Sequence, residues 1–244
     1  MTAPPLRAVL WDFDGTLVDT RARNLSVNRR IVREITGGSW RDFPVLRSQP
    51  AYDTAQRAAV NWREFYRTNC GFSDRQIDRA GDCWAAYQAE DATPVPLVEG
   101  IADALGSLDG LPTGIVSQNS RETIGSVLSS HGLGRRFGCI VGYAEVPMSR
   151  QKPAPDSLLV GLEELTALAP GRALYIGDHA TDICCVDNAN RELAGRGLKL
   201  RVVSVAALWG PGAADDGWAA GADLRAATPN GVVALVDRFT RDQD

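Results

Sequence analysis

The stretch "LWDFDGTLVD", Leu10–Asp19, carries the most informative pattern of the sequence. In it an apolar run ends at two aspartates one residue apart, Asp12 and Asp14, which Gly-Thr follows. The run Ala8–Trp11 predicts a buried strand, because it carries no polar residue. Two carboxylates at the end of a buried strand are costly, since they lose water and repel each other. The pattern therefore predicts that a positively charged group completes a site at this point.

Four further short apolar runs have the same character, and Gly, Pro, Asp or Asn bound them. They predict buried strands over Thr113–Val116, Cys139–Val141, Ala173–Ile176 and Leu200–Val205. Helical patterns lie between the runs, such as a stripe of Leu158, Leu162 and Leu165 with Glu163 and Glu164 opposite. Strands that alternate with helices predict an α/β fold, with a Rossmann-like doubly wound parallel sheet as its core.

The pattern changes between residues 21 and 93, where strand-like runs are absent and helical stripes take over. One stripe consists of Ala58, Trp62, Phe65, Tyr66 and Asn69. The Pro-rich segment "DATPVPLVEG", Asp91–Gly100, is typical of a linker that returns to the first domain. We therefore expect an α/β core formed by residues 1–20 and 94–244, with an inserted all-α cap domain over residues 21–93.

Composition excludes several classes of partner. The chain has 244 residues, a formal net charge of -4 and a pI near 5.3, so no basic field attracts nucleic acid or an anionic membrane. No segment is apolar enough to span a bilayer and the N-terminal sequence lacks a signal-peptide pattern, so we expect a cytoplasmic protein. The five cysteines lack metal-site spacing and are expected to be reduced thiols packed as small apolar groups; the adjacent Cys184 and Cys185 leave a redox role open.

Polar residues follow several of the predicted strands. Ser117, Gln118 and Asn119 come after the second strand, and Asp178 and Asp182 come after the fourth. The loop "RQKPAPD" supplies Lys152. Ligands of parallel α/β sheets bind beyond the carboxyl ends of the strands, at the point where the strand order reverses. The sequence therefore predicts one site in which four carboxylates meet a lysine.

This donor set indicates a metal and a reaction. Carboxylates without histidine or thiolate favour Mg²⁺ over Zn²⁺. A carboxylate beside a bound cation, with a hydroxyl and an ammonium at hand, suits attack on phosphorus through an aspartyl-phosphate. Asp12 is then the nucleophile, and Asp14 gives a proton to the leaving oxygen and later takes one from water. Gly15 lets the backbone pass close to the substrate.

Further residues are expected to bind the phosphoryl oxygens. Ser117, Lys152 and backbone amides near Ser120 would stabilise the charge that develops on them. Gly15, Thr16, Gln118 and Asn119 complete the predicted phosphate-binding loops, although the last two could serve only to shape their loop. In "SWRDFPVLRS", Arg47 or Arg41 could hold a second anionic group of the substrate, or could simply be solvated.

The segments "DFDGTLVD", "IVSQN", "KPAPD" and "GDHATD", in this order, resemble the four motifs of the haloacid dehalogenase superfamily. The helical insertion resembles the phosphoglycolate-phosphatase-like branch, and the resemblance covers nearly the whole chain. It implies that Asp12, the main-chain carbonyl of Asp14 and Asp178 ligate Mg²⁺. It also implies that Asp182 supports the metal's water shell or orients Lys152. His179 departs from the usual pattern, and we expect it to bond to backbone rather than to substrate.

Together these features predict a magnesium-dependent phosphatase that hydrolyses a small phosphate monoester, with closure of the cap excluding water. By the same resemblance, Asp14 favours phosphoryl transfer, because family members that cleave carbon–halogen or carbon–phosphorus bonds lack an acid/base aspartate at this position. Two alternatives stay open: a phosphotransferase or phosphomutase of the same fold, and a protein that binds a phosphorylated ligand without turnover. The expected partner is a small phosphorylated metabolite, and the chain is expected to be a monomer or a homodimer.

Overall fold

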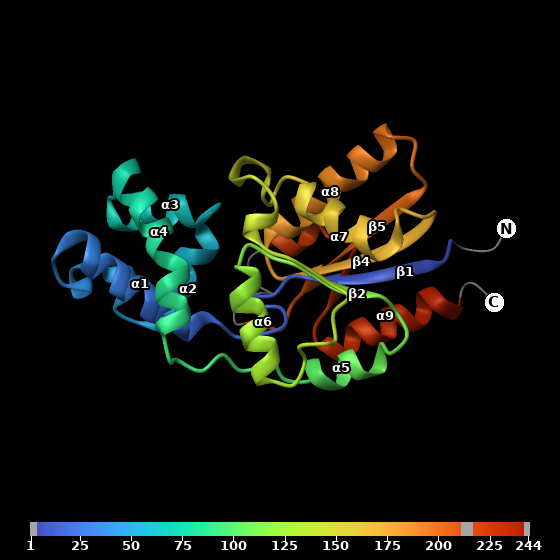
Figure 1. Cartoon of the computed structure of the whole chain (residues 1–244), viewed down its shortest axis with the longest axis horizontal. Coiled ribbons are helices and arrows are strands. Elements are labelled where there is room, and N and C mark those ends of the chain that lie inside the picture. The colour runs from blue at the N-terminus through green and yellow to red at the C-terminus, as the bar shows by residue number, and fades with distance from the viewer. Residues whose placement is uncertain (1–3, 211–216, 242–244) are drawn as a thin grey trace. The chain divides into compact units, whose positions relative to one another are not determined.

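A six-stranded parallel sheet forms the centre of the computed structural model, which describes residues 4–210 and 217–241 (Figure 1). All neighbouring strands pair in parallel, in the order β3-β2-β1-β4-β5-β6. This arrangement confirms the predicted α/β fold with a Rossmann-like sheet. The strands are β1 Leu6–Trp11, β2 Thr113–Val116, β3 Cys139–Val141, β4 Gly171–Gly177, β5 Leu200–Ala207 and β6 Leu224–Ala226.

Helices cover both faces of the sheet. On one face lie α7 (Asp156–Thr166) and α8 (Ala180–Gly195), and on the other lie α5 (Ile101–Ser107) and α9 (Pro229–Arg241) (Figure 1). A further helix, α6 (Arg121–Ser130), follows β2 and contacts β3. Among the described residues, no helix has both the length and the apolar character that a membrane crossing requires.

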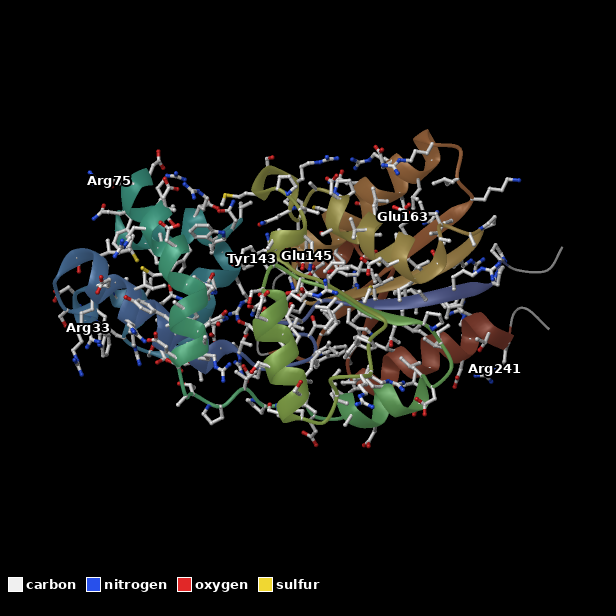
Figure 2. All side chains as sticks on the ribbon, in the orientation of Figure 1. Arg33, Arg75, Tyr143, Glu145, Glu163 and Arg241 are labelled. Carbon is white, nitrogen blue, oxygen red and sulfur yellow. The ribbon has the colours of Figure 1, made fainter. Side chains whose placement is uncertain are left out.

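The alternation of side chains along β1 distributes its residues between the two faces. Ala8 and Leu10 pack in one cluster with Leu158 and Leu162 of α7, and all four are fully buried. Each such leucine contributes roughly 1.5–3 kcal/mol to folding, since its whole side chain leaves water. Glu163 lies on the exposed side of α7, as the helical stripe predicted (Figure 2).

The chain forms two compact units, residues 1–18 with 97–244 (the α/β unit) and residues 19–96 (the helical unit). The sequence pattern predicted these divisions after residue 20 and before residue 94. At the junction, the amide of Val98 donates to the carbonyl of Leu17 at 3.0 Å, and Val18 pairs with Leu97. The two segments at which the chain leaves the α/β unit and returns to it therefore lie next to each other.

The helical unit has its own apolar core, built around Leu25, Ile31, Phe65 and Ile77. The predicted stripe from Ala58 to Asn69 was wrong as a single helix. Ala59 has extended backbone angles, and the side chain of Asn61 accepts from the amide of Glu64 to start a new helix. Its helices are α1 Arg21–Thr36, α2 Gln49–Ala58, α3 Trp62–Cys70 and α4 Asp74–Glu90, with short 3-10 helices at Trp40–Asp42 and Pro44–Leu46.

Candidate active site

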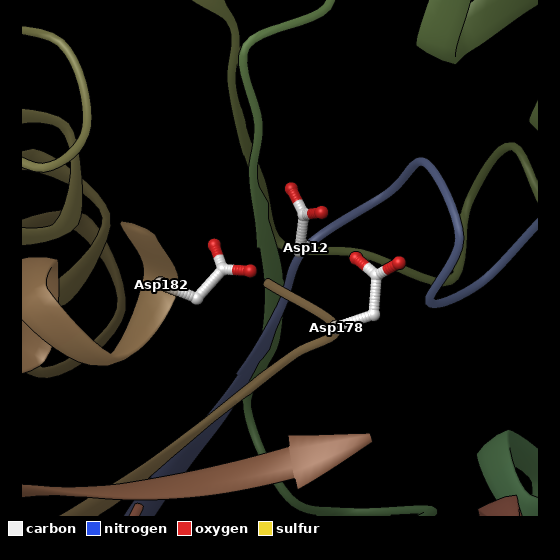
Figure 3. A group of neighbouring side chains, drawn as sticks. All are labelled: Asp12, Asp178 and Asp182. Carbon is white, nitrogen blue, oxygen red and sulfur yellow. The ribbon is translucent and has the colours of Figure 1, made fainter. Parts of the chain in front are cut away.

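The strand order places β1 between β2 and β4, so the order of the chain reverses between β1 and β4. Asp12 follows β1, Asp178 follows β4, and Asp182 lies in the first turn of α8. One carboxylate oxygen from each of these three residues lies within 4.8 Å of the other two (Figure 3). The topology of the sheet therefore brings together three acidic side chains that lie up to 170 positions apart in the chain.

Lys152 neutralises part of this charge. Its Nζ lies 2.7 Å from Asp12 Oδ1 and 2.8 Å from Asp182 Oδ1, and the residue is only 6% exposed. Burial alone would lower the pKa of Lys152, but the attraction of Asp12 and Asp182 raises the pKa overall. The lysine is therefore charged at neutral pH. The Lys152–Pro153 peptide bond in its loop is cis.

The carboxylates carry more negative charge than one lysine can balance. Burial raises the pKa of Asp12 to about 7, with Lys152 opposing the shift and Asp182 adding to it. Burial, followed by repulsion from Asp12 and Asp182, raises the pKa of Asp178 well above its ordinary value. Among the described residues Asp178 has no cationic partner; its hydrogen-bond contact is Thr16 Oγ1 at 3.5 Å. Two buried carboxylates whose charge Lys152 balances only in part, and which offer only oxygen ligands, fit a divalent cation such as Mg²⁺.

Gly15 is required by this packing. Its φ of +77° is one that residues with a Cβ rarely adopt, and a Cβ added there would lie 2.1 Å from Asp178 Oδ2. Thr16 is fully buried, and its carbonyl accepts from Trp209 Nε1 at 3.0 Å. The loop after β1 is therefore held against Asp178 on one side and Trp209 on the other.

Asp182 serves two hydrogen-bonding tasks at once. Its Oδ1 binds Lys152, and its Oδ2 accepts from the backbone amide of His179 at 3.1 Å. The ring Nδ1 of His179 accepts in return from the amide of Thr181 at 3.2 Å, so the two side chains cap the start of α8 reciprocally. His179 thus bonds to backbone, as expected. Both oxygens of Asp182 are engaged by the protein, which fits a residue that orients Lys152.

The loop after β2 contributes the hydroxyl and amide groups. Ser117 is buried at the end of the strand, and its Oγ accepts from the amide of Asn119 at 3.2 Å. Gln118 is exposed, and its Nε2 donates to the carbonyl of Lys152 at 3.2 Å. Asn119 Nδ2 lies 3.1 Å from Asp14 Oδ2 and 3.3 Å from Asp14 Oδ1. The loop therefore contacts both Asp14 and the lysine loop.

Tyr175 is a residue of this site that the sequence analysis missed. It lies on β4 and is fully buried, with its hydroxyl 2.9 Å from the carbonyl of Val116 and 3.2 Å from Asp182 Oδ1. Lys152 Nζ lies 5.1 Å from the centre of its ring. The available signal was a tyrosine within an apolar strand, because a buried hydroxyl needs a polar partner.

The two arginines predicted to contact substrate, Arg47 and Arg41, belong to the helical unit. Arg47 is exposed, and its Nε donates to the carbonyl of Arg41 at 2.7 Å, while the Arg41 guanidinium lies 4.3 Å above the ring of Trp40.

All five cysteines are free, but Cys184 is exposed, so the expectation that all five pack as apolar groups was wrong. Cys184 lies on the outward face of α8, whereas its neighbour Cys185 points into the core.

Comparison with known proteins places this geometry in a family. Residues 9–195 match the family model described as haloacid dehalogenase-like hydrolase. A phosphoglycolate phosphatase of Synechococcus elongatus is 27% identical over 97% of this chain and 100% of its own length. A pyrophosphatase, PpaX, of Bacillus velezensis is 26% identical over 80% of this chain and 85% of its own.

Among solved structures, a putative phosphoglycolate phosphatase from Lactobacillus plantarum has the same fold, with a TM-score of 0.75 and 21% identity. The match covers 95% of this chain and 99% of that one. The chain therefore belongs to the haloacid dehalogenase-like hydrolases. It is a hydrolase of this family that is similar, over most of its length, to phosphatases.

Proposed function

We propose that this protein is a magnesium-dependent phosphatase that hydrolyses a small phosphate monoester through an aspartyl-phosphate on Asp12. The observation that carries the proposal is the ion pair of Asp12 with the buried Lys152, within a cluster of carboxylates that lacks enough positive charge. A dianionic phosphate next to these groups needs further positive charge, which a bound cation supplies. The similarity to phosphatases supports the same class of reaction.

The residues that would hold Mg²⁺ are Asp12, the main-chain carbonyl of Asp14 and Asp178, with Asp182 outside the direct ligands. When bound, Mg²⁺ neutralises charge on the phosphoryl oxygens and the attacking carboxylate. A Cβ at Gly15 would lie 2.1 Å from Asp178 Oδ2, so the Gly15 backbone lies close to this proposed ligand.

Two chemical steps follow from the side chains. Lys152 engages Asp12 Oδ1, so Asp12 Oδ2 attacks phosphorus, the bond from phosphorus to the leaving oxygen breaks, and Asp14 gives that oxygen its proton. Water then attacks the same phosphorus and transfers a proton to Asp14, and the bond to Asp12 breaks to release phosphate. Ser117 and Lys152 hold the phosphoryl oxygens while charge develops on them.

The proposal names a chemical class of substrate and not a single compound. The proposal covers small monoesters, so phosphoglycolate is the first compound to test, and pyrophosphate, which is an anhydride, is tested beside it, because proteins named for these activities are similar over most of the chain. Gly15, Thr16, Gln118 and Asn119 are proposed to shape the phosphate loops. Arg47 stays a predicted contact for the part of the substrate that is not transferred, to be tested by comparing Arg47→Ala on substrates with and without a second anionic group.

The test is phosphate release from a panel of phosphate monoesters, with Mg²⁺ or with EDTA, and with Asp12→Asn alongside. Asp12→Asn is expected to lower turnover more than about 10³-fold without unfolding the protein, because the amide is not a nucleophile and adds no volume. Isomerisation without phosphate release would instead indicate a mutase. Tight binding of a phosphate ester with no turnover would indicate a binding protein, and full activity of Asp12→Asn would refute the covalent mechanism.

A further inference from the structure

We infer that Asn119 is a positioning residue that holds the Asp14 carboxylate for proton transfer to the leaving oxygen. The inference rests on the proposed function, because it assigns Asp14 a role in that reaction. It starts from a contact between two residues that are 105 positions apart: Asn119 Nδ2 lies within hydrogen-bond distance of both oxygens of Asp14.

The orientation of the Asn119 side-chain amide is set by its oxygen, Oδ1. Asn119 Oδ1 accepts from the backbone amide of Ser120 at 2.8 Å, and only an oxygen can accept that hydrogen bond. The NH₂ group therefore faces Asp14. A flipped amide would place two donors against each other at Ser120 and two acceptors against each other at Asp14.

The backbone of Asn119 is fixed as firmly as its side chain. Its amide donates to Ser117 Oγ at 3.2 Å, and its carbonyl accepts from the amide of Tyr143 at 3.0 Å. A Cβ on Gly142 would lie 2.7 Å from that carbonyl oxygen, so the segment after β3 packs directly against it. Asn119 is 5% exposed. A residue held at its amide, its carbonyl and its side-chain oxygen presents its NH₂ group in one place.

A neutral amide donor suits a group that must change its protonation state. While Asp14 is a carboxylate, either oxygen can accept from Asn119. When Asp14 carries a proton on one oxygen, Asn119 can still donate to the other, and the acidic hydrogen stays available for the leaving oxygen. A lysine or arginine in this position would instead favour the carboxylate and oppose its use as an acid.

The role has a kinetic signature that general damage to the loop lacks. In the first step the leaving oxygen takes a proton from Asp14 as its bond to phosphorus breaks. A basic leaving group depends on this proton, whereas a stable anion such as para-nitrophenolate hardly does. Loss of Asp14 orientation should therefore slow poor leaving groups more than good ones. Loss of phosphate binding or of folded protein should slow all of them equally.

The experiment compares Asn119→Ala with the wild type on phenyl phosphate and para-nitrophenyl phosphate, which have similar shapes, at saturating Mg²⁺. The value to measure is kcat/KM, which reports the first irreversible step. We expect a loss of about 10- to 100-fold on phenyl phosphate, since proton transfer by a positioned group contributes about 10²- to 10⁴-fold. The loss on para-nitrophenyl phosphate should be at least about fivefold smaller.

Two further variants distinguish loss of the hydrogen bond between Asn119 and Asp14 from a general perturbation of the loop. Asn119→Asp keeps an acceptor for the Ser120 amide but replaces the NH₂ donor with a carboxyl group that repels the Asp14 carboxylate, so it should also slow phenyl phosphate more than para-nitrophenyl phosphate. Ser120→Ala removes the hydroxyl that accepts from the Thr123 amide and starts α6, so it perturbs the same loop and should affect both esters equally. Circular dichroism confirms that each variant is folded.

The outcomes are distinct. An equal loss on both esters in Asn119→Ala and Asn119→Asp, or no loss in either variant, would overturn the inference and leave the phosphatase proposal intact. A wild-type protein that releases phosphate from neither of these esters nor from any member of the substrate panel would overturn the proposed function, and the inference with it. A greater loss with the poorer leaving group, absent in Ser120→Ala, would establish Asn119 as the positioning residue.

Discussion

At the scale of single residues, the site depends on how closely backbone can approach a carboxylate. In the proposed metal site Asp12 and Asp178 must lie close together to bind one cation, and burial with repulsion from neighbouring carboxylates raises the pKa of both carboxyl groups. Gly15 permits that proximity, because its place against Asp178 has no room for a side chain. The glycine of the sequence motif is therefore a steric requirement of the proposed metal site as well as a turn residue.

Gly15→Ala tests this requirement. The added methyl group would push Asp178 aside, so we expect a rise of at least about tenfold in the Mg²⁺ concentration that gives half-maximal activity. The strained φ would also lower the free energy of unfolding by about 1–3 kcal/mol. Titration of activity with Mg²⁺ and urea denaturation measure the two effects.

Gly110→Ala is the matched control for Gly15→Ala. Gly110 has a φ of +86°, and nothing lies within 4 Å of the Cβ position. It should lose stability through backbone strain and keep its Mg²⁺ dependence. If Gly15→Ala retained the wild-type Mg²⁺ dependence, the steric argument for Gly15 would be incorrect.

At the scale of secondary-structure elements, Tyr175 links three of them. Its hydroxyl reaches from β4 to the last carbonyl of β2 and to Asp182 in the first turn of α8. The one hydroxyl hydrogen can satisfy only one of these acceptors at a time. The tyrosine therefore connects β2, which precedes Ser117, to α8, whose Asp182 binds Lys152.

Tyr175→Phe tests this link. The ring keeps its packing and its place beside Lys152, but the buried carbonyl of Val116 loses a donor. We expect the free energy of unfolding to fall by about 1–3 kcal/mol, the cost of an unsatisfied buried group. We also expect kcat to fall more than KM changes, because Asp182 and Lys152 lose a restraint. Unchanged values of both the unfolding free energy and kcat would mean that the hydroxyl contributes nothing to the site.

The elements show what sequence patterns can and cannot predict. The five predicted strands are present because each is a buried run whose character is local. The strand Leu224–Ala226 was missed, since it has three residues and its central Arg225 is exposed. The aspartates and Lys152 were found because strand ends converge in a parallel sheet. The contacts of Tyr175 and Asn119 depend on which side chains meet across the site, and no spacing in the sequence encodes them.

At the scale of the whole molecule, the site sets how stability depends on pH. The ordinary pKa of Asp12 is 3.8, and in the folded chain the pKa is about 7. A raised pKa in an acid means that the folded state holds the proton more tightly than the unfolded state. The stability that this contributes is complete below pH 3.8 and is lost as the pH rises to about 7. The pKa of Asp178 is shifted in the same direction, and Lys152 stays charged throughout this window.

Mg²⁺ should reverse this loss. We expect the metal-free protein to have a lower melting temperature near neutral pH than at mildly acidic pH, because the buried carboxylates repel once they ionise. At a pH above the pKa of Asp12, added Mg²⁺ should raise the melting temperature strongly. At a concentration of 100 times its Kd, the free energy of unfolding should rise by about 2.7 kcal/mol. The rise should be smaller in acid, where protons compete with the cation for the same oxygens. Thermal unfolding with Mg²⁺ or EDTA at the two pH values measures these differences.

Asp178→Asn distinguishes binding of Mg²⁺ at the carboxylate cluster from a general effect of salt on stability. The amide has nearly the same volume and no charge, so this variant should be more stable than the wild type when both are metal-free at neutral pH. It should also lose most of the stabilisation by Mg²⁺, because one of the proposed ligands is gone. If Mg²⁺ raised the melting temperature of Asp178→Asn as much as that of the wild type, the cation would be binding elsewhere, and the carboxylate cluster would not be its site.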